Sequence, residues 1–194
     1  MKVFLRMALA SYLVFPLAGL AAAQQAVPPP PGPAASGPLL PLTMQFIQDK
    51  LSRLGVVNYV AYTHDSIDNS TWTNSFSTET TNVTADPATC RISYHEKRIK
   101  DGNVTSDKDF TFNLSEIQEV VIMPREQLLK KVNTRAGHPS WDARIDPPVF
   151  MLVVRKAEDT EWYFYFFDED LANRVAKAVV HGVELCGGGN KSPF

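Results

Sequence analysis

The segment that decides the fold reads "EWYFYFFDEDLANRVAKAVVHGVELCGGG", residues Glu161–Gly189. Its first part, Glu161–Phe167, is apolar at nearly every position, which is typical of a strand buried on both faces or strongly curled. Asp168 is a good helix N-cap, and the acidic residues after it stand where the helix dipole favours negative charge. At about 100° per residue, one stripe of the helix is apolar: Leu171, Val175, Val179, Gly182 and Cys186. Such a broad apolar face needs a sheet or barrel to cover.

The residues before this segment predict mostly antiparallel strands. A leading helix begins at Thr43 as N-cap and ends at Gly55, because Met44, Ile47 and Leu51 share one face. Strand patterns, either alternating or rich in β-branched and aromatic residues, then occur at Val56–Thr63, Trp72–Thr80, Cys90–Ile99, Asp109–Leu114, Glu119–Met123 and Val149–Val154. The Asp-Gly pair within Lys100–Asn103 is a strong hairpin signal.

The predicted order is therefore a leading helix, about seven strands and one long amphipathic helix. The unit "LSEIQEVVIM", the two late strands and "FFDEDLANRVAKAVVHGVEL" directly after them resemble the pleckstrin-homology-like superfold over residues 56–186. This resemblance implies an α+β fold with a curled antiparallel sheet, or a partly open barrel, closed at one end by the C-terminal helix. Another antiparallel α+β fold is the alternative.

That superfold hosts phosphoinositide binding, peptide binding and scaffolding, so the fold does not give the function. The phosphoinositide-binding branch uses clustered Lys and Arg around its first two strands. Val56–Phe76 contains neither residue type, which argues against inositol phosphates as ligands.

The first 23 residues have the pattern of a cleaved secretory signal. Lys2 and Arg6 form a basic region, Met7–Leu20 is apolar, and Ala21–Ala23 supplies small residues for cleavage. The apolar run is shorter than the roughly 20 residues of a membrane-spanning helix. We therefore predict a secreted or periplasmic protein with no stable membrane insertion after cleavage.

Residues 24–42 are predicted to be a Pro-rich linker, 43–186 a single domain and 187–194 a flexible tail. The linker carries seven prolines between Gln24 and Pro41, and these favour an extended spacer. Loss of Lys2 and Arg6 leaves 17 basic residues against 21 acidic ones, a net charge of −4. A mildly acidic domain is poorly suited to nucleic acid.

The two cysteines, Cys90 and Cys186, are predicted to pair, because exported proteins favour disulfides. The alternative is two buried free thiols. His95 and Glu96 are neighbours on a predicted strand and should point to opposite faces, so they do not act on one atom together. The chain has no H-E-x-x-H, C-x-x-C, G-x-S-x-G or phosphate-loop motif. We expect no catalytic residues, metal or cofactor.

The stretch "PREQLLKKVNTRAGHPSWDARIDPP", Pro124–Pro148, is the candidate partner loop. It is long for a connection in a compact domain, it is locally basic, and Trp141 offers a large contact area. The candidate residues are Arg125, Lys130, Lys131, Arg135, His138, Trp141 and Arg144. In the other interpretation, Leu128, Leu129 and Val132 continue a strand or short helix and Trp141 packs against the core.

Three functional hypotheses follow. The first is an exported, non-enzymatic binding module that recognises a protein or peptide, either at an exposed sheet edge or at residues 124–148. The second is a binder of a small apolar ligand or lipid in the envelope, which requires an unfilled interior. The third, less favoured, is a hydrolase or metal enzyme. The aromatic residues Trp162, Phe164, Phe166, Phe110 and Phe112 are sufficient to fill a small core, which favours the first hypothesis.

Overall fold

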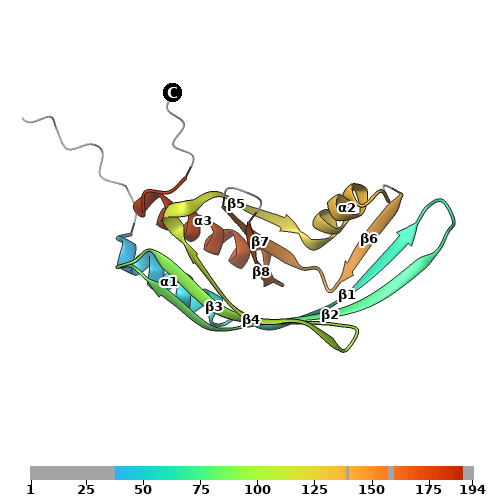
Figure 1. Cartoon of the computed structure of the whole chain (residues 1–194), viewed down its shortest axis with the longest axis horizontal. Helices are drawn as coiled ribbons and strands as arrows, with labels where there is room; N and C mark the ends of the chain where they lie inside the picture. Colours follow the sequence, from blue (N-terminus) through green and yellow to red (C-terminus); the bar gives the residue numbers. More distant parts are fainter. Residues whose placement is uncertain (1–37, 139, 157–159, 190–194) are drawn as a thin grey trace, which may run out of the picture. The chain divides into compact units, whose positions relative to one another are not determined.

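The computed structural model describes residues 38–138, 140–156 and 160–189. Within these residues the chain forms three α-helices, one short 3-10 helix and eight strands in two antiparallel sheets (Figure 1). The protein is therefore α+β, with open sheets in place of a closed barrel. The predicted signal peptide, the linker up to residue 37 and the last five residues of the predicted tail lie outside the described residues.

The larger sheet, sheet A, has the strand order β4 (Asn103–Asn113), β3 (Arg91–Lys100), β2 (Thr71–Asp86), β1 (Gly55–Asp65) and β6 (Trp141–Asp146). Sheet B has the order β5 (Ile117–Pro124), β7 (Phe150–Lys156) and β8 (Glu161–Phe166). The helices are α1 (Leu40–Leu51), α2 (Arg125–Arg135) and α3 (Glu169–Leu185), and the 3-10 helix η1 spans Leu114–Glu116.

Strand β7 separates two hydrophobic clusters. Leu152 and Val154 belong to the first cluster, and Met151 and Val153 belong to the second. All four side chains are at most 1% exposed. Successive side chains of a strand point to opposite faces, so one strand contributes to both clusters. Strand β7 is therefore buried on both faces.

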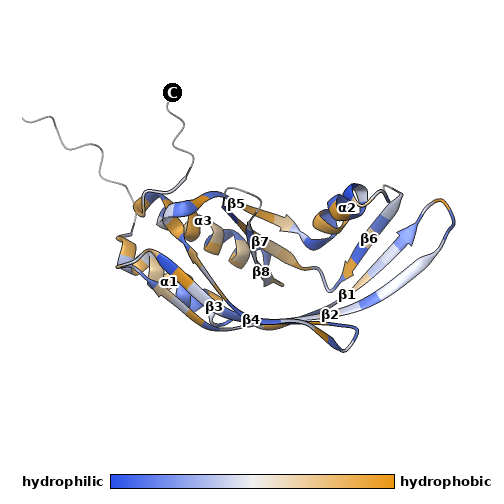
Figure 2. Cartoon of the chain, viewed as in Figure 1, coloured by the Kyte–Doolittle hydropathy of each residue, from blue (hydrophilic) through white to orange (hydrophobic). Residues whose placement is uncertain are grey.

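The first cluster lies among α1, α3 and the inner faces of both sheets. Met44, Ile47 and Leu51 of α1 are wholly buried beside Val175 and Val179 of α3. Aromatic rings fill the space between the sheets: the Tyr94–Phe164 and Phe112–Trp162 centroids are 4.7 Å and 4.9 Å apart. In Figure 2, α1, α3 and sheet B contain many hydrophobic positions, in contrast to the more polar hairpin of β1 and β2. Four of the five aromatic residues predicted to fill the core are buried, and the fifth, Phe110, is half-buried.

Helix α3 forms as predicted. The Asp168 side chain accepts a hydrogen bond of 3.1 Å from the Leu171 amide, which satisfies one of the free N–H groups of the first turn. The buried face carries Ala172, Val175, Val179, Gly182 and Val183. After the helix, Gly187 has φ of +76°, a conformation that glycine adopts without steric cost.

The bounds of the leading helix and of two strands differ from the prediction, and α1 ends at Leu51, before Gly55. Helix α1 begins at Leu40, so Thr43 is a buried residue within it and not its N-cap. Pro41 is tolerated because N–H groups in the first turn have no acceptor within the helix, so the N–H that proline lacks is not missed. Strand β2 extends to Asp86 and β4 begins at Asn103. The addition to β2 places Val83 and Ala85 in the first cluster between polar residues. The addition to β4 is mostly polar, and backbone pairing with β3 holds it. The Asp-Gly hairpin is confirmed, with φ of 50° at Asp101 and 80° at Gly102.

The predicted disulfide is present between Cys90 and Cys186, whose Cα atoms are 6.0 Å apart. Cys90 directly precedes β3, and Cys186 directly follows α3. The bridge therefore fixes the end of α3 to sheet A. The sequence separation is 96 residues, so the loop that the bridge closes is long.

Replacing both cysteines with alanine should lower the free energy of unfolding by up to roughly 4.7 kcal/mol, because the unfolded chain regains the freedom of a long loop. Urea unfolding of the double variant measures this difference, and the reduced wild-type protein should behave as the variant does. Two free thiols in the unreduced, denatured protein, or a loss below about 1 kcal/mol, would contradict the account.

Candidate functional site

Residues 124–148, the candidate partner loop, are not one continuous loop. They contain α2 and β6, and β6 pairs with β1 at the edge of sheet A. The helix matches the alternative interpretation of this stretch, but Trp141, which that interpretation packed against the core, belongs to neither hydrophobic cluster. The segment interrupts sheet B, since β5 and β7 on either side of it are paired neighbours.

Three of the predicted basic residues are already engaged within the fold. The Arg125 Nε donates to the Tyr59 hydroxyl at 3.1 Å, and Lys130 Nζ lies 2.7 Å from Asp142 Oδ1. The Arg144 guanidinium lies over the Tyr62 ring, 4.8 Å from its centroid. Lys131 and Arg135 are exposed on α2 and make no ion pair within the described part of the chain. Three of the five basic residues therefore make contacts within the fold, and Lys131 and Arg135 remain exposed.

His138 and Trp141 form an aromatic group with Trp72. The His138 and Trp141 rings stack with centroids 4.0 Å apart, and the Trp72 centroid is 4.8 Å from that of Trp141. Trp141 Nε1 donates to Asp65 Oδ2 at 2.7 Å. The Ile67 amide and, more weakly, the Trp141 indole lower the pKa of Asp65. Trp141 is half-buried and held in place.

Trp72 and Trp141 border a cleft of about 550 Å³ between α2 and the inner face of sheet A, which we call the tryptophan cleft. In Figure 1, α2 lies on the same side of β1 and β2 as sheet B. The cleft residues come from β1, β2, β3, α2 and β6: Ala61, Thr63, Thr71, Trp72, Thr73, Asn74, Phe76, Lys100, Leu129, Asn133 and Trp141. Of these, the sequence analysis singled out only Trp141 as a site residue.

A second concave surface lies between β5 and α3, and we call it the β5–α3 groove. It consists of two hollows of about 500 Å³ and 290 Å³. Both are bordered by Val120, Val180 and Glu184, so they are parts of one groove. Residues 117–122 form one wall and residues of α3 and the following turn form the other.

The groove contains a strand edge that is free of charge over much of its length. Strand β5 stands at the edge of sheet B, and its residues from Val120 to Met123 are half-buried and apolar. The two edges of sheet A carry charged residues: Asp107, Lys108 and Asp109 on β4, and Asp142, Arg144 and Asp146 on β6. Charged side chains protect an edge strand from pairing. Strand β8, the other edge of sheet B, is mostly buried.

One backbone contact already reaches β5 from outside its sheet. The Gly189 amide donates to the Ile117 carbonyl at 2.9 Å, and the Gly188 amide donates to the Val183 carbonyl at 2.8 Å. The first residues of the predicted tail are thus bonded to the fold. The Ile117 carbonyl shows that β5 accepts a hydrogen bond from a segment beyond its own sheet.

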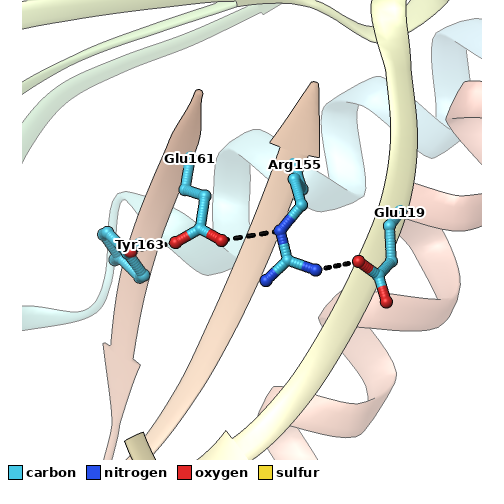
Figure 3. A network of polar contacts seen from close by, with 4 residues as sticks. All are labelled: Glu119, Arg155, Glu161 and Tyr163. Atoms are coloured by element: carbon cyan, nitrogen blue, oxygen red, sulfur yellow. Dashed lines mark hydrogen bonds and ion pairs between the residues drawn. The ribbon is translucent and has the colours of Figure 1, made fainter. Parts of the chain in front are cut away.

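A polar ladder crosses sheet B at one end of the groove (Figure 3). Arg155 on β7 lies between Glu119 on β5 and Glu161 on β8, its Nε donating to Glu161 Oε1 at 2.6 Å. The Tyr163 hydroxyl also donates to Glu161. Burial raises the pKa of Glu161, but Tyr163 and Arg155 together outweigh it and lower the pKa. Burial and Glu161 raise the pKa of Tyr163 to about 12. These pairings hold the three strands in register.

An ion pair with a buried carboxylate lies on the inner face of β3. Glu96 is fully buried, and Arg98 on the same strand donates from Nη2 to Glu96 Oε2 at 3.0 Å, while its Nε lies 2.7 Å from Oε1 without hydrogen-bond alignment. Arg98 also lies over the rings of Tyr163 and Tyr165. Burial raises the pKa of Glu96, and Arg98 opposes that shift. The Glu96 carboxylate has no exposed surface, whereas Arg98 is partly exposed.

His95 lies on the opposite face of β3, as predicted. Its ring nitrogens are each 2.9 Å from a carboxylate, Nε2 from Asp107 and Nδ1 from Asp109. The hydrogen bond to Asp109 and the charges of both aspartates raise the pKa of His95. Across the described ranges, no group of His, Cys, Asp and Glu side chains is arranged to hold a metal ion. In the same ranges, every helix is too short or too polar to cross a membrane.

No family model, curated protein or solved structure matches this chain.

The Glu96–Arg98 pair generates a test of pH dependence. Arg98→Met should lower the free energy of unfolding by about 3 kcal/mol at pH 7.5, because it leaves a buried carboxylate without its partner. A carboxyl whose folded pKa is raised loses stability as the pH rises through that pKa. The cost of Arg98→Met should therefore be smaller at pH 5. Urea unfolding at both values measures it.

The matched variant is Glu96→Gln combined with Arg98→Met, which removes the unpaired charge and should recover most of the loss at pH 7.5. A cost that is equal at both pH values, or a double variant no more stable than Arg98→Met alone, would overturn this account of the pair.

Proposed function

We propose that this protein is an exported, non-enzymatic binding module that takes an extended segment of a partner protein or peptide into the β5–α3 groove. One observation supports this most: an apolar edge strand lies beside a helix, and the two border one continuous groove. A peptide that adds a strand to a sheet edge gains affinity from its backbone hydrogen bonds. Its alternate side chains then enter the hollows and give specificity.

The side chains of the groove indicate which segment fits. Val120 and Val180 supply apolar surface in both hollows, and Val180 is 40% exposed. Lys177 and His181 border the larger hollow, and Glu119 borders the smaller one. We therefore propose an extended ligand with apolar residues at alternate positions, with an acidic group near Lys177.

The arrangement of elements supports the proposed likeness to the pleckstrin-homology-like superfold. Two antiparallel sheets enclose a core, and a C-terminal helix covers one side of it. The chain departs from a seven-stranded pattern, because α2 and the added strand β6 lie between β5 and β7. We therefore propose that α2 and β6 are an insertion into the pleckstrin-homology-like pattern.

Export is part of the proposal. The disulfide is compatible with an extracellular or periplasmic location, where such bonds persist. The predicted signal at residues 1–23 would direct the chain there. The competing hypothesis of an apolar-ligand or lipid carrier needs an empty interior, and the buried aromatic residues of the first cluster argue for a filled one.

The groove can be tested with peptides selected from a random library on residues 24–194. Val180→Glu should lower the affinity for the selected peptides tenfold or more, because the substitution places a charge against apolar side chains. Val104→Glu is the matched control, since Val104 is also exposed, at 56%, and lies on β4. Fluorescence polarisation gives both affinities. Equal weakening by the two variants, or none by Val180→Glu, would contradict the proposed groove.

A further inference from the structure

The tryptophan cleft is separate from the β5–α3 groove and shares no bordering residue with it. Its volume of about 550 Å³ lies in the range of small-molecule sites, roughly 300–1,000 Å³. We propose that this cleft binds a small ligand that has a flat or ring-shaped apolar face and a carboxylate group.

The aromatic side chains of the cleft are the reason for proposing a ligand with a flat or ring-shaped face. Trp72 is 40% exposed, although a side chain of this size is normally well buried. The Asp65 carboxylate, which accepts the Trp141 indole N–H, and the stacked His138 ring fix Trp141 beside it. A rigid aromatic surface that is only partly covered binds flat apolar faces at little cost in conformational entropy.

The positive charge of the cleft is the reason for proposing a carboxylate on the ligand. Lys100 is the one charged residue among those that border it. Its ammonium group lies 5.9 Å from the Phe76 centroid and makes no ion pair with any described residue. The neighbouring Asp101 carboxylate accepts from the Ser75 amide at 2.7 Å instead. Lys100 is exposed, and an anionic group entering the cleft would meet its ammonium group and could accept a charge-assisted hydrogen bond from it.

Asn133 gives a second, independent indication of a missing acceptor. This residue of α2 borders the cleft, and its Nδ2 is enclosed without any hydrogen-bond acceptor in the described structure. Buried polar groups are nearly always satisfied, and an unsatisfied donor costs about 1–3 kcal/mol. An acceptor-rich ligand beside α2 would satisfy this amide after a small side-chain movement.

Two sources supply such a ligand: aromatic acids and uronic acids. 2-Naphthoate and D-glucuronate represent them as probes, and 2-naphthalenemethanol and methyl glucoside are the matched neutral compounds. Saturation-transfer NMR and calorimetry on residues 24–194 should show binding of at least one carboxylate and binding at least tenfold weaker for its neutral counterpart. The probe that binds identifies the source.

Variants place the binding in the cleft. Lys100→Gln should lower the affinity for the carboxylate probe about tenfold or more, because it removes a charged hydrogen-bond donor. Lys97→Gln is its control, because Lys97 belongs to the same strand and points to the other face. Trp72→Ala should abolish binding, and Trp72→Phe should retain part of it. Circular dichroism confirms that each variant is folded.

Failure of both carboxylates to bind would overturn the proposal, as would equal affinities for Lys100→Gln and Lys97→Gln. Neutral and anionic probes of equal affinity would also overturn it. Val180→Glu should leave carboxylate binding unchanged, so the outcome is independent of the proposed peptide groove.

Discussion

The burial of β7 on both faces is the constraint on which the other elements depend. Four consecutive side chains, from Met151 to Val154, are almost completely removed from solvent. They need cover on two sides, and no single layer provides it. Helices α1 and α3 with β3 and β4 enclose one face, and β1 with β6 encloses the other. The disulfide then holds the end of α3 to sheet A, across the first cluster.

The same arrangement leaves two surfaces open. The chain leaves sheet B after β5, forms α2, adds β6 to sheet A and returns as β7. Because of this excursion, α2 lies over the inner face of β1 and β2 and borders the tryptophan cleft. Sheet B keeps only three strands, so β5 remains an edge strand next to α3. Both candidate sites follow from how β7 is covered.

Sequence reasoning succeeded where one physical signal was strong. The apolar runs of β7 and β8, the acidic start and apolar stripe of α3, and the Asp-Gly hairpin each specify local structure without reference to the rest of the chain. The two cysteines could be paired because only one pairing exists. Helix α2 was predicted only as an alternative, since it has no fully buried residue. Strand β6 was not predicted, since "WDARID" carries three charges. The pairing of β6 with β1 depends on backbone hydrogen bonds.

The sites were harder to predict than the fold. Trp72, Lys100 and Asn133 come from three distant segments, and only the strand register and the position of α2 bring them to one cleft. The edge position of β5 likewise depends on which strands it pairs with, and its own residues do not encode this. The basic residues of 124–148 looked like a recognition surface because their partners, Tyr59, Asp142 and Tyr62, lie in other elements.

Amide hydrogen exchange of residues 24–194 tests the central claim most directly. The account predicts the slowest exchange in β7, which is paired on both sides and buried on both faces. It predicts an alternating pattern in β5, with slow amides facing β7 and fast amides facing the groove. Uniformly slow exchange along β5, or faster exchange in β7 than in β5, would contradict the account.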